Sequence, residues 1–252
     1  MKKIYRKDEI VQGTPEWFII RQLKFTASHA STIIAAGKGL ETLIKEMVAE
    51  YFSSQQYSEY TQKYKNEQMQ RGNDFEAMAR NIYEFETGST VTEVGFAEIS
   101  DYVGCSPDGL VDEDGLIEIK NHSDKVFCEL VESEKIDKKY LDQMQYQLYV
   151  MRHFGRKWVD YFGFNPNFQP NFFKKRIEPD SATFAKIENG LIIGVKMLQN
   201  ILESLEGKLV KQEYHIEEVL EKVEDQIPEV GKKVEIEEKT TKVTEMADDF
   251  PF

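Results

Sequence analysis

The chain has 252 residues, 40% of them apolar and including 16 Phe and 12 Tyr, which is enough to bury a sizeable core. No apolar run is long enough to span a bilayer, and the first residues contain no apolar segment of the kind found in signal peptides. Two isolated cysteines, Cys105 and Cys128, exclude a disulfide framework, a zinc ribbon and a four-cysteine iron–sulfur site. We therefore expect a soluble intracellular protein.

The net charge of −13 is unevenly distributed. Residues 212–252 contain 5 Lys/Arg and 13 Asp/Glu, a net of −8, so residues 1–211 carry a net of −5. A body of mildly acidic sum can still contain a basic channel, so the charge does not exclude a nucleic-acid partner. The division predicts a folded domain over residues 1–211 and an acidic, flexible tail over residues 212–252.

Helical patterns dominate the first third of the chain. They predict a Pro-started helix and a second helix within 14–36 with a break at Phe25 and Thr26, an amphipathic helix over 39–53, a loop or fraying helix over 54–65, and a long helix over 66–86 that ends at Gly88.

The pattern then changes to that of strands. Segments rich in Val, Ile, Phe and Gly, separated by turn signals, predict a β-meander over 90–99, 102–111 and 115–120. The remaining elements are predicted as a helix over 135–153, strands over 157–164 and 171–178, and a last helix over 181–205. Helices that precede and follow central strands predict an α/β or α+β fold with a mixed sheet.

One segment combines a turn aspartate with charged residues on a strand. Asp108 lies in Ser-Pro-Asp-Gly-Leu, ten residues before Glu118 in Gly-Leu-Ile-Glu-Ile-Lys. Strand alternation sends Glu118 and Lys120 to the same face, and the hairpin brings Asp108 alongside them. Two carboxylates at a sheet edge suit Mg²⁺, which takes waters and phosphate oxygens as its other ligands. An adjacent lysine can position water or hold a phosphate as a point charge.

These residues resemble the motif of the PD-(D/E)XK nucleases, and specifically that of the phage lambda exonuclease (YqaJ-like viral recombinase) family. Three other blocks resemble motifs of this family and occur in family order: Trp17-x-x-x-Arg21 with Thr26-Ala27-Ser28, Arg71-Gly72-x-x-x-Glu76-x-x-Ala79-Arg80-x-x-Tyr83, and Tyr140-x-x-Gln143-x-Gln145. The matching blocks span residues 13–178. The resemblance implies a restriction-endonuclease-like core, in which helices flank a central mixed β-sheet.

The resemblance also implies catalytic roles for individual residues. Asp108 and Glu118 would be metal ligands, with the backbone carbonyl of Ile119 as a third, and Lys120 would be the catalytic lysine. Two helical residues would complete this centre, Glu76 by acting on the metal through water and Gln145 by closing the pocket. His122 is expected as a neighbour of the pocket; it follows Asn121 where the family usually has Cys-Pro.

A second set of matching residues would cradle a 5′-terminal phosphate. The resemblance assigns this role to Arg21, Ser28 and Ser106. Arginine offers a forked set of donors to phosphate, and hydroxyls at a helix start add neutral donors. Trp17 is expected to be a packing residue.

The activity that the resemblance implies is a Mg²⁺-dependent exonuclease, with Mn²⁺ able to substitute, that acts on double-stranded DNA ends. It would degrade the 5′-ended strand and leave a 3′ single strand for recombination. The resemblance further implies a homotrimeric ring, a single-strand annealing protein as partner, and a phage- or prophage-encoded protein in the cytoplasm of a bacterial host.

The last residues resemble the acidic tip of bacterial single-stranded-DNA-binding proteins; they are Asp248, Asp249, Phe250, Pro251 and Phe252. An anionic tether that ends in an aromatic residue suits a basic, hydrophobic notch on a partner. The tail therefore predicts docking to proteins that bind such tips, and a tail that only confers solubility is the alternative.

Three other functions stay open. The first is a different PD-(D/E)XK nuclease, either a structure-specific endonuclease or a Cas4-like enzyme, although Cas4-like proteins usually have four cluster-binding cysteines. The second is a non-catalytic module that binds DNA ends, against which the intact Asp108, Glu118 and Lys120 argue. The third is a scaffold for replication proteins that acts through its tail.

Overall fold

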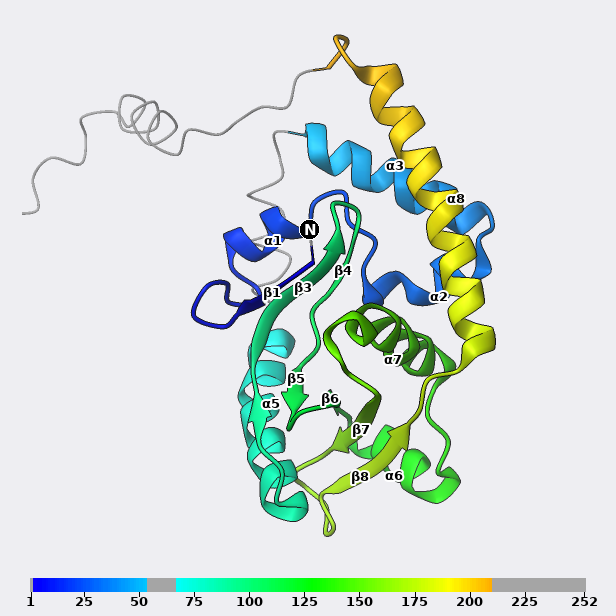
Figure 1. The fold of residues 1–252 in the computed structure, drawn as a ribbon. Coiled ribbons are helices and arrows are strands. Elements are labelled where there is room, and N and C mark those ends of the chain that lie inside the picture. The colour runs from blue at the N-terminus through cyan, green and yellow to red at the C-terminus, as the bar shows by residue number, and fades with distance from the viewer. Residues whose placement is uncertain (1, 54–66, 210–252) are drawn as a thin grey trace, which may run out of the picture. The chain divides into compact units, whose positions relative to one another are not determined.

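The computed structural model describes residues 2–53 and 67–209, with only the backbone described for residues 67–74, and all of them belong to one compact unit, Met1–Gln212 (Figure 1). Its α-helices are α1 (Pro15–Arg21), α2 (Ala30–Ala35), α3 (Lys38–Phe52), α5 (Glu67–Thr87), α6 (Asp124–Ser133), α7 (Lys138–Met151) and α8 (Ser181–Leu205). Its strands are β1 (Lys3–Arg6), β2 (Val91–Thr92), β3 (Val94–Ser100), β4 (Val103–Cys105), β5 (Gly109–Val111), β6 (Gly115–Asn121), β7 (Trp158–Phe164) and β8 (Phe172–Ile177).

The strands form two sheets. The larger sheet has the order β2-β5-β6-β7-β8, in which only β6 and β7 pair in parallel. The smaller sheet has the order β1-β3-β4 and is antiparallel throughout. A parallel pair inside an otherwise antiparallel sheet makes the larger sheet mixed, as the sequence predicts.

Strand β6 contributes to both sides of the larger sheet because its side chains alternate. Ile117 and Ile119 pack with Ala79 and Tyr83 of α5 in one apolar cluster. Leu116 belongs to the other cluster, which contains the buried residues of α7. Helices α5 and α7 therefore cover opposite faces of the sheet, and the predicted fold class, a central mixed sheet flanked by helices, is confirmed.

Helix α8 runs along α2 and α3 on the right-hand side of Figure 1. Its approach to α2 depends on a glycine: a Cβ atom on Gly190 would lie 2.0 Å from the carbonyl oxygen of Ile33. Gly194, one turn later, faces the ring of Phe25 in the same way, with a Cβ contact of 2.8 Å. Gly190 thus lets the backbones of α8 and α2 pack closely, and Gly194 makes room for the ring of Phe25, which precedes α2.

Several elements differ from the prediction. The predicted meander is wrong as a single unit, since β3 and β4 pair in the smaller sheet while β5 and β6 belong to the larger one. Strand β1 and helix α6 were not predicted, although Ser123 precedes α6 at the N-cap and Phe127 and Leu130 are its buried residues. Neither α8 nor any other described helix is long and apolar enough to cross a membrane.

The substitution Gly190→Ala tests the close packing of α2 and α8. We expect it to lower the free energy of unfolding by about 1–3 kcal/mol, because the added methyl overpacks the contact with Ile33. This loss outweighs the gain of at most about 1 kcal/mol in helix propensity. Urea denaturation measures the change. Asn189→Ala, at the exposed neighbouring position, serves as control and should not destabilise the protein; an equally stable Gly190→Ala protein would contradict the packing argument.

Candidate active site

The predicted acids and lysine meet where β5 and β6 pair. Gly109 lies opposite Ile117, so Asp108, one residue before β5, lies at the level of Glu118. Asp108 is tied to the next strand, since its Oδ2 accepts a hydrogen bond of 2.7 Å from the backbone N–H of Ile119. Lys120 forms an ion pair with Glu118 Oε1. The structure thus brings together the three residues that the sequence singled out.

Glu118 is fully buried, and α7 provides its polar partners. The side-chain amide of Gln143 donates to Oε1 at 2.6 Å, and that of Gln147 donates to Oε2 at 2.6 Å. With the Lys120 ammonium, these amides give the carboxylate three donors. Burying a carboxylate without such partners is costly, so the two glutamines are part of what makes this position possible.

Lys120 remains an ammonium in this setting. Burial alone would lower the pKa of Lys120, but the carboxylates of Glu118 and Asp108 beside it outweigh that effect and raise the pKa. A lysine held in its charged form is suited to neutralise phosphate oxygen as a point charge, and it is not suited to accept a proton.

The surroundings of Asp108, in contrast, disfavour its charged form. Burial of its carboxyl group raises the pKa of Asp108, and the nearby Glu118 and Glu76 carboxylates raise it further, against the effects of Lys120 and the Ile119 N–H. Three acids with one lysine between them leave an excess of negative charge in a desolvated place. Such a site favours the entry of a cation.

The donor set fits a divalent metal only in part. Within the described ranges, no group of three or more His, Cys, Asp or Glu side chains converges in the geometry of a metal site. The set implied for Asp108, Glu118 and the Ile119 carbonyl is smaller, with two carboxylates and one backbone oxygen. Mg²⁺ commonly binds through one or two carboxylates and completes its shell with water and substrate phosphate, so this set suits Mg²⁺ better than a closed protein cage would.

Glu76 lies at the edge of the acid cluster. Burial raises the pKa of Glu76, while the guanidinium of Arg80, one turn along α5, lowers it; the carboxylates of Glu93 and Glu118 add to the rise. Glu76 Oε1 accepts a hydrogen bond of 2.8 Å from Arg80. The structure therefore places Glu76 near the two predicted ligands.

Gln145 lies elsewhere. Its side-chain amide donates to the carbonyl of Glu178 at 2.8 Å and its Oε1 accepts from the N–H of Asp180 at 2.9 Å, so it ties α7 to the segment before α8. The expected place in the pocket is taken by Gln143 and Gln147. These two lie four residues apart and share a helix face, whereas Gln145 projects from the other side. The spacing Gln143–Gln147 was the signal available in the sequence.

The predicted phosphate residues form a connected polar group next to the acids. Arg21 donates to Ser106 Oγ at 3.4 Å and to Thr26 Oγ1 at 3.3 Å, and the hydroxyls of Thr26 and Ser28 are 3.1 Å apart. Three elements supply this phosphate cradle, which we define as Arg21, Thr26, Ser28 and Ser106. Thr26 was not predicted as a member.

Trp17 organises the cradle and does more than pack. The Arg21 guanidinium lies over its ring at 4.0 Å, and the indole N–H donates to Ser106 Oγ at 2.9 Å and to the carbonyl of Gly95 at 3.1 Å. The i, i+4 spacing of Trp17 and Arg21 on a helix, visible in the sequence, is the signal for this contact.

His122 lies beside the pocket as expected. Its Nε2 is 2.6 Å from the hydroxyl of Tyr161, and its ring lies 6.2 Å from that of Tyr140. Burial, with Lys120 and Lys139 nearby, lowers the pKa of His122, which favours the neutral ring. The predicted tail-tip residues fall outside the described part of the chain.

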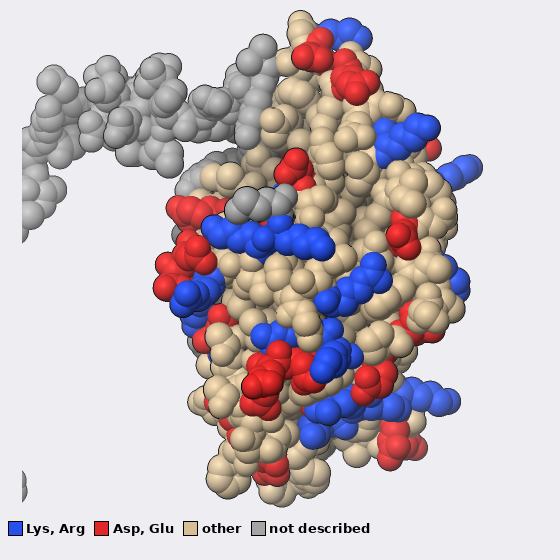
Figure 2. Space-filling model, viewed as in Figure 1, with Lys and Arg blue, Asp and Glu red and all other residues tan. Residues whose placement is uncertain are grey.

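The surface does not carry the acidic excess evenly. Figure 2 shows bands of Lys and Arg side chains across one face of the body, with acidic side chains between them. A polyanion can therefore meet positive charge on a protein whose total charge is −13.

A mixed sheet between helices, with two carboxylates and a lysine where two adjoining strands pair, places the chain in the class of α/β domains that carry the PD-(D/E)XK arrangement. The model of the YqaJ-like viral recombinase domain matches residues 16–153, more than half of the chain, and the chain belongs to this family.

Solved structures agree with this membership. The chain is similar to an alkaline exonuclease from Laribacter hongkongensis, at 32% identity and a TM-score of 0.65, over 77% of this chain and 97% of that chain. The structure of the same exonuclease in complex with dAMP matches equally, with the same identity, TM-score and coverage. The comparison with curated proteins found no match. Family and neighbour together support a nuclease.

The crowding of acids predicts a pH-dependent effect of Asp108→Asn on the metal-free protein. Because the folded-state pKa of Asp108 is raised, the stability that Asp108 contributes is complete below its ordinary pKa and is lost as pH rises through the raised value. Removing the charge should therefore raise the free energy of unfolding by roughly 1 kcal/mol or more at pH 8, and by less at pH 5. Urea denaturation in EDTA at both pH values measures this.

Asp114→Asn is the matched control for that experiment. The pKa of Asp114 is lowered, chiefly by its hydrogen bond with Lys157, so removing this charge should give no gain at pH 8. A loss of stability in Asp108→Asn at pH 8 would contradict the electrostatic account of the site.

Proposed function

We propose that the protein is a Mg²⁺-dependent exonuclease that degrades the 5′-ended strand of double-stranded DNA and leaves 3′ single strands for recombination. The observation that carries the proposal is the joint placement of Asp108, Glu118 and Lys120 at the pairing of β5 and β6, next to a cradle of phosphate donors. Membership of the YqaJ-like viral recombinase family and similarity to an alkaline exonuclease support the same activity.

Asp108, Glu118 and the Ile119 carbonyl would hold the metal ion. When bound, the ion supplies polarisation of the phosphate and activation of a water molecule. Lys120, held as an ammonium by the acids, neutralises charge that develops on the phosphate oxygens. Gln143 and Gln147 fix the orientation of Glu118 so that its carboxylate does not have to reorganise during the reaction.

The phosphate cradle would bind the 5′-terminal phosphate of the strand. Arg21 supplies charge-assisted donors, and Ser28 and Ser106 add hydroxyls. Ser106 and Asp108 are two residues apart in the chain, so their Cα atoms can be no more than about 7 Å apart. A strand end held by its phosphate would thus present one of its first linkages to the acids.

Assembly and partners follow from the family in this proposal. We infer a homotrimeric ring, Mn²⁺ as a substitute for Mg²⁺, a single-strand annealing protein as partner, and action in the cytoplasm of a bacterial host. The tail tip Asp248–Phe252 would dock to proteins that bind acidic tips of this kind, in line with its anionic and aromatic composition.

Asp108→Ala tests the metal-dependent chemistry. We expect hydrolysis of linear duplex DNA in Mg²⁺ to fall by roughly 10³-fold or more, because the several kcal/mol of stabilisation that a metal supplies are lost. Single-turnover kinetics with excess protein measure the rate. Asp114→Ala, away from the cluster, should retain the wild-type rate. Undiminished hydrolysis in Asp108→Ala would rule out the proposed centre.

Strand polarity is tested with duplexes labelled at either end, with or without a 5′-phosphate. We expect loss from the 5′-phosphorylated strand, and Arg21→Ala should reduce the preference for phosphorylated ends by roughly 10- to 100-fold, the value of one charged hydrogen-bond partner. Arg21→Lys keeps the charge but loses the forked guanidinium, so its preference for phosphorylated ends should lie between those of the wild type and Arg21→Ala. Equal digestion of both strands would refute the polarity, and cleavage of closed circular duplex would indicate an endonuclease.

A further inference from the structure

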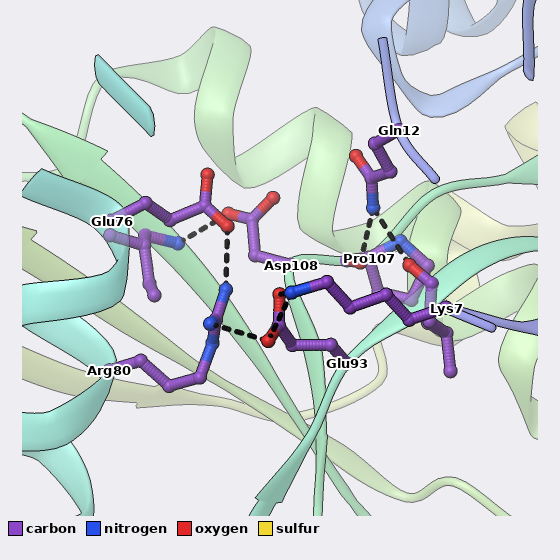
Figure 3. Close-up of polar contacts among 9 residues, drawn as sticks. Lys7, Gln12, Glu76, Arg80, Glu93, Pro107 and Asp108 are labelled. Carbon is purple, nitrogen blue, oxygen red and sulfur yellow. Dashed lines mark hydrogen bonds and ion pairs between the residues drawn. The ribbon is translucent and has the colours of Figure 1, made fainter. Parts of the chain in front are cut away.

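A chain of alternating charges leads from the surface to the acid cluster. Lys7 lies 2.8 Å from both carboxylate oxygens of Glu93, and Glu93 Oε1 lies 3.0 Å from Arg80. Arg80 in turn bonds Glu76 at 2.8 Å. Figure 3 shows this row, with the Glu76 carboxylate next to that of Asp108. Lys7, Glu93, Arg80 and Glu76 are called the charge row below.

Arg80 is the central member of the charge row. Its guanidinium uses one terminal nitrogen for Glu76 and the other for Glu93, and the residue is only 9% exposed. Its Nε is buried and has no hydrogen-bond partner among the described residues. Placing a guanidinium here is costly unless both carboxylates are present, so the arrangement depends on Glu76 and Glu93 together.

The charge row also joins three elements, and one of them, β1, is distant in the sequence from the other two. Glu76 and Arg80 belong to α5, Glu93 precedes β3, and Lys7 follows β1. Glu93 is therefore fixed by the smaller sheet, and through Arg80 it fixes the rotation of the Glu76 side chain. A glutamate on an exposed helix face has no such constraint, because its three side-chain torsions are free.

We infer that Arg80 is a positioning residue, which aims the carboxylate of Glu76 at the Asp108–Glu118 cluster and is itself anchored by Glu93 and Lys7. The inference rests on the proposed function and on the role that the family resemblance implies for Glu76, which is to act on a divalent ion through water. Groups that orient the donors of a metal site commonly affect metal affinity by 10- to 100-fold.

A positioning role for Arg80 and its charge alone predict opposite changes in metal affinity when Arg80 is replaced. Arg80 is a cation near a site for a cation, so its charge alone opposes metal binding, and its removal would tighten that binding. If Arg80 instead holds Glu76 in place, its removal weakens binding. The sign of the change thus distinguishes the two accounts.

The experiment measures Mn²⁺ affinity of the full-length, DNA-free protein by the EPR signal of free Mn²⁺. Arg80→Gln should weaken Mn²⁺ binding roughly 10-fold. Arg80→Lys keeps the charge but cannot bridge two carboxylates with a rigid fork, so it should weaken binding to an intermediate degree. Lys45→Gln, which breaks the exposed i, i+4 ion pair with Glu41, is the matched control and should leave the affinity unchanged.

Two variants protect the test against misfolding. Arg80→Lys preserves the buried charge, and Lys7→Gln loosens the row from its exposed end; circular dichroism verifies that each is folded. Lys7→Gln should weaken Mn²⁺ binding in the same direction as Arg80→Gln and by a smaller factor. Unchanged or tighter Mn²⁺ binding in folded Arg80→Gln and Arg80→Lys would overturn the inference.

Failure of the proposed function has a different signature. If wild type and Asp108→Ala bind Mn²⁺ equally weakly, the metal centre itself is absent, and the inference falls with it. If wild type binds Mn²⁺ and Asp108→Ala does not, while both Arg80 variants match wild type, only the role of Arg80 is refuted.

Discussion

The buried carboxylate of Glu118 is the constraint on which the site depends. A fully buried acid requires donors, and Gln143, Gln147 and Lys120 supply them. Two of these donors belong to α7, so the position of α7 against β6 is fixed by polar contacts as well as by apolar packing. The same contacts orient Glu118 toward Asp108, which makes the geometry of the site a consequence of how the helix binds the sheet.

The close placement of three acidic side chains makes the site favourable for a cation. Burial and the neighbouring carboxylates, that of Glu118 among them, raise the pKa of both Asp108 and Glu76, and Lys120 offsets only part of this rise. When these acids are ionised with no cation nearby, their repulsion opposes folding, and a divalent ion bound as proposed would relieve that repulsion. The same residues would thus lower the stability of the metal-free protein and favour the binding of a metal ion. Such a trade-off between stability and function is common at functional sites.

Local sequence patterns predicted the acids, since period-two alternation and a turn suffice to bring Asp108 to Glu118 and Lys120. They also predicted most helices and the mixed sheet. Contacts that depend on tertiary packing were not accessible: the ion pair between Lys7 and Glu93 joins residues 86 apart in the chain, and Arg80 reaches Glu93 from α5. Helix α6 was missed because its two buried residues give too short a pattern. The place of Gln145 was expected from a motif, although helix periodicity alone would have separated it from Gln143.

The spacing of cradle and acids is set by a short and well-anchored piece of chain. Pro107 lies between Ser106 and Asp108, and its carbonyl accepts a hydrogen bond of 3.2 Å from the side chain of Gln12, which also binds the carbonyl of Val94 at 2.9 Å (Figure 3). In the proposed function, recognition of a strand end and attack on its backbone would share this short span, which Gln12 anchors. Because only Pro107 separates Ser106 of the cradle from Asp108, a change at this residue would be expected to displace both groups together.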